Sequence, residues 1–232
     1  MNVAIIGGGY AGMAAAVTLA AEGLPVSVFD AAAQLGGRAR GVVRHGIQLD
    51  NGQHILMGCY HRTLEMVTKV GGDTRQDFLR MPLQLELYGK FRFTASRLPA
   101  PLHVLSGLLS AKGVSPATRL NAMWFMLAMR RRRFVLSRDM TALNLLRAHR
   151  QGELIRLLWE PVCISALNTP VDRASAQVLL NVLRDSLMGQ RSDSDILIPR
   201  IDLSALFPDR AGAFVKRNGG TVYSGCSVEA IL

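Results

Sequence analysis

The chain opens with Val3-Ala4-Ile5-Ile6, followed at once by Gly7-Gly8-Gly9-Tyr10-Ala11-Gly12. The β-branched run predicts a buried strand, and the good helix formers after the glycines predict a helix. Gly23 ends that helix, and the apolar run Val26–Phe29 predicts a second strand that finishes at Asp30. A strand, a glycine turn, a helix and a second strand form a βαβ unit typical of dinucleotide-binding proteins.

Each glycine of this turn has its own physical role. Gly7 permits the tight turn, Gly9 leaves room for the backbone to approach a pyrophosphate, and Gly12 lets the helix lie close to the sheet. The N–H groups at the start of the helix can bind phosphate oxygens, with the helix dipole in support. Asp30 stands where a carboxylate can accept hydrogen bonds from ribose hydroxyls. The pattern therefore predicts a dinucleotide bound by these four residues.

A second glycine pair follows Asp30 after a short spacer, in Gly36-Gly37-Arg38. Gly37 would bring backbone close to the same dinucleotide, and the guanidinium of Arg38 can bind phosphate oxygens through two hydrogen bonds. The combination resembles the FAD-dependent amine oxidase and phytoene desaturase superfamily, whose N-terminal signature joins the Rossmann glycines, an acid and Gly-Gly-Arg. The resemblance implies that the cofactor is FAD.

Three further segments extend this likeness. Residues 50–60 resemble the segment that runs beside the ribityl chain and the isoalloxazine, which implies cofactor contacts from Gly52 and Gln53. Residues 218–231 are expected to form a β-hairpin whose second strand places the backbone of Val228 against the adenine. Together with residues 159–163, Trp-Glu-Pro-Val-Cys, these segments are most similar to the hydroxysqualene dehydroxylase family of hopanoid biosynthesis.

That resemblance implies a flavoenzyme that reductively removes the hydroxyl of hydroxysqualene to give squalene, and hence a lipophilic isoprenoid substrate. Two alternatives remain open. An amine oxidase or a phytoene or carotenoid-type desaturase would use the same cofactor frame. A non-catalytic prenyl-binding relative of the fold would need no flavin, and the intact glycines, Asp30 and Arg38 argue against it.

The expected fold is α/β, with a Rossmann-like FAD-binding domain interrupted by a mostly helical substrate domain. We expect the first part of the FAD-binding domain over residues 1–80, the substrate domain over 81–210, and the return to the FAD-binding domain over 211–232. The C-terminal half of the superfamily's pattern is absent from these 232 residues. The resemblance therefore implies a truncated product or a second half supplied by a longer gene product.

Charge is concentrated in the expected substrate domain. The formal net charge is +10, and residues 87–150 contain twelve basic residues and one acid. Within them Arg130, Arg131, Arg132 and Arg133 follow the apolar run 122–129. This arrangement suits the surface of an anionic membrane, where each basic residue contributes roughly 1 kcal/mol, although such a run is more often core. No nucleic-acid recognition motif accompanies the cluster. Without a signal peptide we expect a cytoplasmic protein, peripheral on the inner face of the membrane.

The sequence identifies no catalytic side chain. His54 could act as a general acid or serve as a structural donor, and Asp50 could bind substrate or cap the turn that follows it. Trp124 and Trp159, with Phe125 and Phe134, could line a hydrocarbon tunnel or pack in the core. The dispersed cysteines and histidines give no metal-binding spacing, so we expect no metal.

Overall fold

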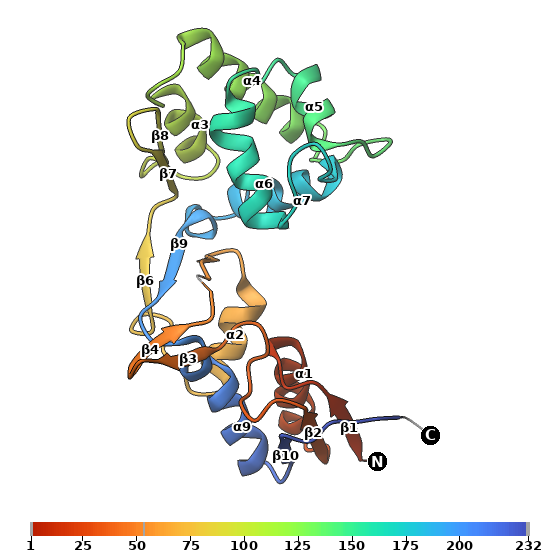
Figure 1. Ribbon diagram of the computed structural model, residues 1–232. Coiled ribbons are helices and arrows are strands. Elements are labelled where there is room, and N and C mark those ends of the chain that lie inside the picture. Colours follow the sequence, from red (N-terminus) through yellow and green to blue (C-terminus); the bar gives the residue numbers. More distant parts are fainter. Residues whose placement is uncertain (1, 53, 231–232) are drawn as a thin grey trace. The chain divides into compact units, whose positions relative to one another are not determined.

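The computed structural model describes residues 2–52 and 54–230 (Figure 1). The chain divides into two compact units. Unit 1 holds the described residues up to Leu56, then Tyr60–Arg80 and those from Leu197 onward, whereas unit 2 holds Met57–Cys59 and Met81–Ile196. The chain thus returns to unit 1 at Leu197, earlier than the expected residue 211, because the helix over 203–206 and the start of the helix over 208–217 also pack in unit 1.

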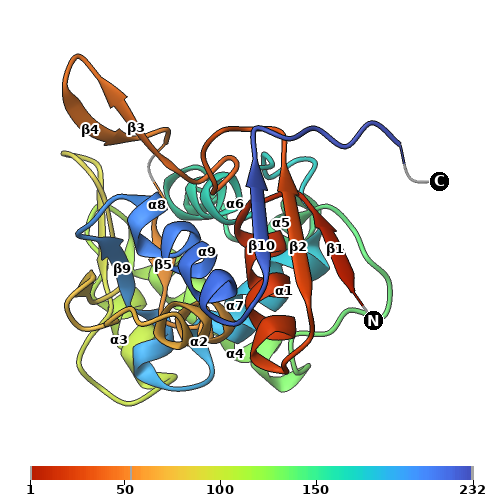
Figure 2. The same ribbon diagram turned by 90° about the horizontal axis from the view of Figure 1, so that it is seen from below.

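The centre of unit 1 is a parallel sheet of three strands in the order β1-β2-β10 (Figure 2). These strands are β1 (Val3–Ile6), β2 (Val26–Asp30) and β10 (Thr221–Ser224). The strand-helix-strand arrangement predicted for the first 30 residues is present, since β1 and β2 are joined by helix α1 (Tyr10–Ala21).

Helix α1 buries one apolar face, in which alanines lie beside larger side chains. Met13, Ala16, Val17 and Ala20 are buried at the helical spacing, and they belong to the same apolar core as Val26 and Val28 of β2. Helix α9 (Pro208–Arg217) packs against α1 and leads into β10. The two helices therefore cover one face of the sheet, and the alternate residues Phe29 and Tyr223 stack on the other, with ring centroids 4.9 Å apart.

The remaining elements of unit 1 surround this centre. A two-stranded antiparallel hairpin turns at His45 and Gly46, both with positive φ. The chain passes between the units within β5, β6 and β9, which form a sheet in the order β5-β9-β6. The bounds of these elements are β3 (Gly41–Arg44), β4 (Ile47–Asp50), β5 (Leu56–Met57), α2 (His61–Lys69), β6 (Phe78–Met81), β9 (Ile196–Pro199) and α8 (Leu203–Leu206).

The expected C-terminal hairpin over residues 218–231 is wrong. β10 lies parallel to β2, because α9 carries the chain back before the strand begins, and a hairpin would need a second, antiparallel strand. After β10 the N–H groups of Gly225 and Cys226 donate to the carbonyls of Ala32 and Asp30, both at 2.9 Å. Residues 226–230 then run without regular structure, and Ile231 lies outside the described residues.

Unit 2 is mostly helical and has its own apolar core. A short antiparallel hairpin, β7 and β8, precedes the helices. Phe125, Met126, Met129, Phe134 and Trp159 are all at most 3% exposed in this core. The elements are β7 (Gln84–Leu87), β8 (Phe91–Thr94), α3 (Leu102–Leu109), α4 (Pro116–Arg131), α5 (Ala142–Ala148), the π-helix η1 (Ile155–Trp159), α6 (Glu160–Leu167), α7 (Ala176–Leu187) and the 3₁₀ helix η2 (Arg191–Ser194).

Helix α4 contains the apolar run 122–129, and its apolar face packs inward. This burial rules out the interpretation of that face as a membrane contact, and of Phe125, Phe134 and Trp159 as residues of an open tunnel. Trp124 differs, because 62% of its surface is exposed. Across residues 2–52 and 54–230, we find no helix with the length and apolar character required to cross a membrane.

A partly buried ion pair ties the loop before β6 to α9 in unit 1. Arg210 of α9 donates through both guanidinium nitrogens to the carboxylate of Asp77, just before β6. The N–H of Asp73 also donates to that carboxylate, at 3.1 Å. The Asp77 side chain is 10% exposed and that of Arg210 is 31% exposed. The hydrogen bond from Arg210 lowers the pKa of Asp77 below its usual value.

We therefore expect Asp77→Asn to lower the free energy of unfolding by about 2 kcal/mol at neutral pH. Because the folded-state pKa of Asp77 is depressed, its contribution is complete above the unfolded pKa of about 3.9 and is lost as pH falls through the folded value. Urea titrations of wild type and variant should therefore converge toward acidic pH. Arg62→Gln, which breaks the exposed pair with Glu65, is the control and should change little at any pH. A stability gap that is independent of pH would contradict this account.

Candidate functional site

The two glycine segments, distant in the sequence, lie side by side in unit 1. The N–H of Gly36 donates to the carbonyl of Gly8 at 2.9 Å, and Gly9 forms a β-bridge with Gly36. A Cβ on Gly37 would come within 3.3 Å of the Cα of Gly9. Gly36 and Gly37 both have positive φ, at 106° and 61°, which favours glycine. The approach of these backbones places the Gly-Gly-Arg sequence at the start of helix α1.

The glycines at the start of α1 serve different needs. Gly7 has a φ of 103°, so the turn itself requires glycine. A Cβ on Gly12 would overlap the carbonyl oxygen of Gly7, so helix packing requires glycine there. Gly9 has an ordinary φ of −72°, and the nearest atom to an added Cβ is the Cα of Gly37 at 4.0 Å. The space beside Gly9 is thus open to a ligand.

Helix α1 begins without a side-chain cap. Gly9 is its N-cap residue and has no side chain to accept a hydrogen bond, and the first intrahelical bond runs from the N–H of Met13 to the carbonyl of Gly9. The N–H groups of the first turn are therefore available to an anion at the positive end of the helix dipole. A diphosphate fits these donors.

Asp30 fastens the glycine turn to the end of β2. Its Oδ2 accepts the N–H of Gly8, and its Oδ1 accepts the N–H of Ala32 at 2.7 Å. A carboxylate has about four acceptor positions, so both oxygens can still accept a hydrogen bond from a ribose hydroxyl. The sequence pattern predicted the ribose contact of Asp30, but it did not predict that Asp30 holds the glycine turn against the end of β2.

Two arginines near the glycine pair carry donors without a partner among the residues that the structure describes. Arg38 is exposed and has no hydrogen bond or ion pair among the residues that the structure describes. The Nε of Arg40 is buried and also lacks a partner in the described part of the chain. Buried donors without partners are rare in folded proteins. These donors suit the phosphates of a dinucleotide, so the residues present fit such a cofactor.

Asp50 and His54, from the segment expected beside the flavin, form hydrogen bonds within unit 1. Oδ1 of Asp50 accepts the N–H of Leu203 at 2.8 Å, at the start of α8. Nδ1 of His54 lies 2.9 Å from the carbonyl oxygen of Gly52, and it must donate because that oxygen only accepts. These contacts match structural roles for Asp50 and His54. Gln53 lies outside the described residues.

Residues 57–59, the next part of this segment, belong to unit 2. The N–H groups of Gly58 and Cys59 donate to the carbonyls of Asp195 and Asp193, both at 2.9 Å. A Cβ on Gly58 would overlap the carbonyl oxygen of Ser192, so this close approach requires glycine. Burial, with the Asp193 carboxylate in support, raises the pKa of the Cys59 thiol, which keeps it protonated at neutral pH.

Val228, the expected adenine contact, lies in the irregular segment after β10 with 36% of its surface exposed. Its backbone is in no strand, so the structure does not bring it to the glycine turn through sheet pairing.

Tyr10, which the sequence pattern did not single out, ties the start of α1 to α8. Its hydroxyl donates to the carbonyl of Leu203 at 2.8 Å. Burial raises its pKa, and the carboxylates of Asp50, Asp202 and Asp209 add to the effect, so the hydroxyl stays protonated. The signal that could have found this region is Asp202, which caps α8 by accepting the N–H groups of Ser204 and Ala205.

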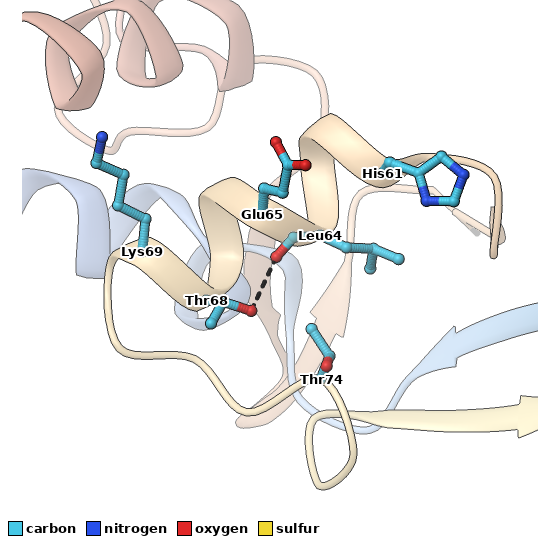
Figure 3. A pocket seen from close by; sticks show the side chains of 6 residues that line it. All are labelled: His61, Leu64, Glu65, Thr68, Lys69 and Thr74. Atoms are coloured by element: carbon cyan, nitrogen blue, oxygen red, sulfur yellow. Dashed lines mark hydrogen bonds between the residues drawn. The ribbon is translucent and has the colours of Figure 1, made fainter.

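A shallow pocket of about 520 Å³ lies along the outer face of α2 (Figure 3). Its lining residues are His61, Leu64, Glu65, Thr68, Lys69 and Thr74. The Thr68 hydroxyl donates to the carbonyl of Leu64 within the helix, at 3.0 Å. None of the predicted cofactor residues lines this pocket, so it is separate from the glycine segments.

Comparison with known proteins agrees with this geometry. Residues 5–70 match the NAD(P)-binding Rossmann-like domain family. The chain is 30% identical over 225 residues to hydroxysqualene dehydroxylase of Zymomonas mobilis, covering 93% of this chain and 51% of that protein. It is 27% identical over 219 residues to zeta-carotene desaturase of Arabidopsis thaliana, covering 85% of this chain and 38% of that protein.

The fold also matches a solved structure. An oxidoreductase from Methanosarcina mazei superimposes with a TM-score of 0.74 at 17% identity, covering all of this chain and 53% of the other. The chain therefore spans about half the length of the hydroxysqualene dehydroxylase and of the solved oxidoreductase that it matches. With a dinucleotide-binding domain of the Rossmann type and similarity along nearly its whole length, the chain is a relative of the hydroxysqualene dehydroxylases, over about half of their length, and it shares the fold of the solved oxidoreductase.

Proposed function

We propose that the chain binds FAD at the two glycine segments and contributes that cofactor site to a flavoenzyme of isoprenoid metabolism. The observation that carries the proposal is the approach of the Gly36-Gly37-Arg38 segment to the glycine turn. An NAD-binding βαβ unit needs the glycine turn, the start of the helix and the acid after the second strand, and no second glycine pair. Here a second backbone segment and the free guanidinium of Arg38 add donors on the same side.

In this proposal each part of the site binds one part of the cofactor. The N–H groups at the start of α1 and the Arg38 guanidinium bind the diphosphate, and Gly9 gives the diphosphate room. Asp30 accepts from the ribose while it holds the glycine turn in place. Gly37 and the segment containing Gly52 and Gln53 lie along the cofactor, and the adenine contact of Val228 remains part of the proposal.

The reaction that we propose is reductive loss of the allylic hydroxyl of hydroxysqualene, giving squalene. Reduced FAD supplies the hydride for the carbon that loses the hydroxyl, and water leaves once the hydroxyl is protonated. The similarity to hydroxysqualene dehydroxylase supports this direction. The chain's own contribution is to fix the cofactor, since Asp50 and His54 are engaged in hydrogen bonds within unit 1.

The second candidate reaction is desaturation of a carotenoid-type substrate, which runs in the oxidative direction. The similarity to zeta-carotene desaturase favours it over an amine oxidase. Both candidates take a long, water-insoluble hydrocarbon and need the same cofactor. The non-catalytic prenyl-binding alternative needs no flavin, so it would not explain the free N–H groups at the start of α1 or the free guanidinium of Arg38.

We further propose that unit 2 docks peripherally on an anionic membrane through a basic cluster, defined as Arg130, Arg131, Arg132 and Arg133. All four side chains are exposed. Leu120 and Trp124 lie about three and about two turns before the cluster on the same exposed side of α4, with 46% and 62% of their surfaces exposed. An exposed tryptophan beside arginines is typical of proteins that bind the interface of a membrane.

The cofactor site can be tested by Gly9→Leu. The added side chain would begin in the open space beside Gly9, where its Cβ comes no nearer to a protein atom than 4.0 Å, so flavin retained after desalting should fall at least about tenfold while the circular dichroism spectrum persists. Ala15→Leu, which places the same side chain on the exposed side of α1, is the matched control and should retain flavin. Unchanged flavin content in Gly9→Leu would refute the assignment of the site.

The direction of the reaction can be tested with the flavin-loaded chain under anaerobic conditions. After reduction with dithionite, addition of hydroxysqualene should restore the absorbance of oxidised flavin, and mass spectrometry should detect squalene. If instead the oxidised form is bleached by a carotenoid precursor, the desaturase is the correct candidate. If neither change occurs, both reactions are excluded for this chain. Its visible spectrum still reports whether the cofactor is bound.

The basic cluster can be tested by replacing all four arginines with glutamine. We expect partition onto vesicles that contain phosphatidylglycerol to fall at least about 100-fold, because four favourable surface charges are lost. The matched control removes four exposed arginines of unit 1, Arg44, Arg62, Arg75 and Arg217. Equal losses in the two variants would show that net charge alone, and not this cluster, governs binding.

A further inference from the structure

Unit 2 contains a second group of arginines, gathered around a pocket of about 590 Å³. This arginine pocket lies between the end of α5 and the π-helix η1. It is lined by Leu143, Arg147, Arg150, Gly152, Ile155 and Arg156. Neither the basic cluster nor any predicted cofactor residue contributes to it.

The three guanidinium groups of this pocket are not neutralised by the protein. Arg147, Arg150 and Arg156 are exposed, and within residues 2–52 and 54–230 their side chains form no ion pair or hydrogen bond. The neighbouring carboxylate of Glu153 instead accepts the hydroxyl of Thr118 at 3.2 Å. Three like charges around one hollow repel one another, and a bound anion relieves that repulsion. The negative end of the short helix α5 offsets only about half of one of these three positive charges.

The buried side chain of Gln151 holds the backbone beside these arginines in place. Gln151 is fully buried; its amide nitrogen donates to the carbonyls of Asn121 and His149, and its oxygen accepts the indole N–H of Trp159. The two residues that flank Gln151 have positive φ, 55° at Arg150 and 40° at Gly152. A left-handed arginine next to a π-helix is unusual backbone of the kind found at ligand sites. Arg150 therefore lies in a loop that these hydrogen bonds hold in place, between Arg147 of α5 and Arg156 of η1.

The rest of the lining indicates the class of ligand. Leu143 and Ile155 place aliphatic surface beside the guanidinium groups, and the pocket has no aromatic ring on which a nucleic-acid base could stack. Asn121 of α4 donates to the carbonyl of Arg150 at 3.5 Å, and the exposed Trp124 lies one turn further along α4. Burial, with the charge of Arg132 of the basic cluster in support, lowers the pKa of His149, which stands beside Arg150. The pocket thus adjoins the surface proposed to meet the membrane.

We propose that Arg147, Arg150 and Arg156 bind the phosphate of an anionic phospholipid, with Leu143 and Ile155 against the first part of its acyl chains. This proposal rests on the membrane docking proposed above and adds to it a site for one lipid headgroup. The basic cluster would attract any anionic surface, whereas the arginine pocket would select a phosphate because guanidinium groups bind phosphate oxygens in pairs.

The test compares vesicles of phosphatidylcholine whose negative charge comes either from phosphatidylglycerol or from oleate, matched in surface potential. We expect the wild-type chain to partition more strongly onto phosphatidylglycerol. The variant R147Q/R150Q/R156Q should lose roughly 100-fold on phosphatidylglycerol and bind the two kinds of vesicle equally. The control R44Q/R75Q/R217Q removes the same charge from exposed arginines of unit 1 and should keep the preference.

The other outcomes overturn the proposal. A pocket variant that keeps the preference, or a control that loses it equally, would show that the arginine pocket does not recognise the lipid. Inorganic phosphate that displaces the wild-type chain beyond the effect of chloride at equal ionic strength would assign the pocket to a free anion. Circular dichroism and flavin content of each variant show whether it is folded and whether the cofactor site is intact. Failure of the FAD proposal is therefore measured separately.

Discussion

The close approach of two backbone segments governs the candidate cofactor site. Gly8 and Gly9 lie against Gly36 and Gly37 with no side chains between them, and Asp30 joins the glycine turn to the strand that precedes the second pair. Because this contact is made by backbone, it places N–H groups and not side chains beside the start of α1. The position of Arg38 and the openness of the space beside Gly9 both depend on it.

Sequence reasoning succeeded where a local pattern determines structure. The β1-α1-β2 unit and the mostly helical character of unit 2 could be predicted, because strand runs, glycine turns and helix ends are set by neighbouring residues. The expected hairpin at the C-terminus failed for a non-local reason. Thr221–Ser224 reads as a strand, but whether its neighbour is antiparallel or parallel depends on α9 and on the free edge of β2, which no short pattern encodes.

The candidate site shows the same division. The glycines, Asp30 and Arg38 could be found from their spacing, whereas the hydrogen bonds of Asp50 and Tyr10 to the backbone of Leu203 join segments more than 150 residues apart in the sequence. The apolar run of α4 was ambiguous for a related reason. A helix shows the same composition whether its face meets a core or a membrane, and only the packing of Phe125, Met126 and Met129 distinguishes the two.

The glycines of the first turn differ in whether the fold itself requires them. Gly7 and Gly12 are demanded by the backbone conformation and by the contact between helix and strand, so any descendant that keeps the fold must keep them. Gly9 meets no such demand, and a lineage that had lost its dinucleotide would be free to replace it. Loss of glycine at this one position, with its two neighbours in the signature retained, would therefore mark a protein that has given up its cofactor while preserving its architecture.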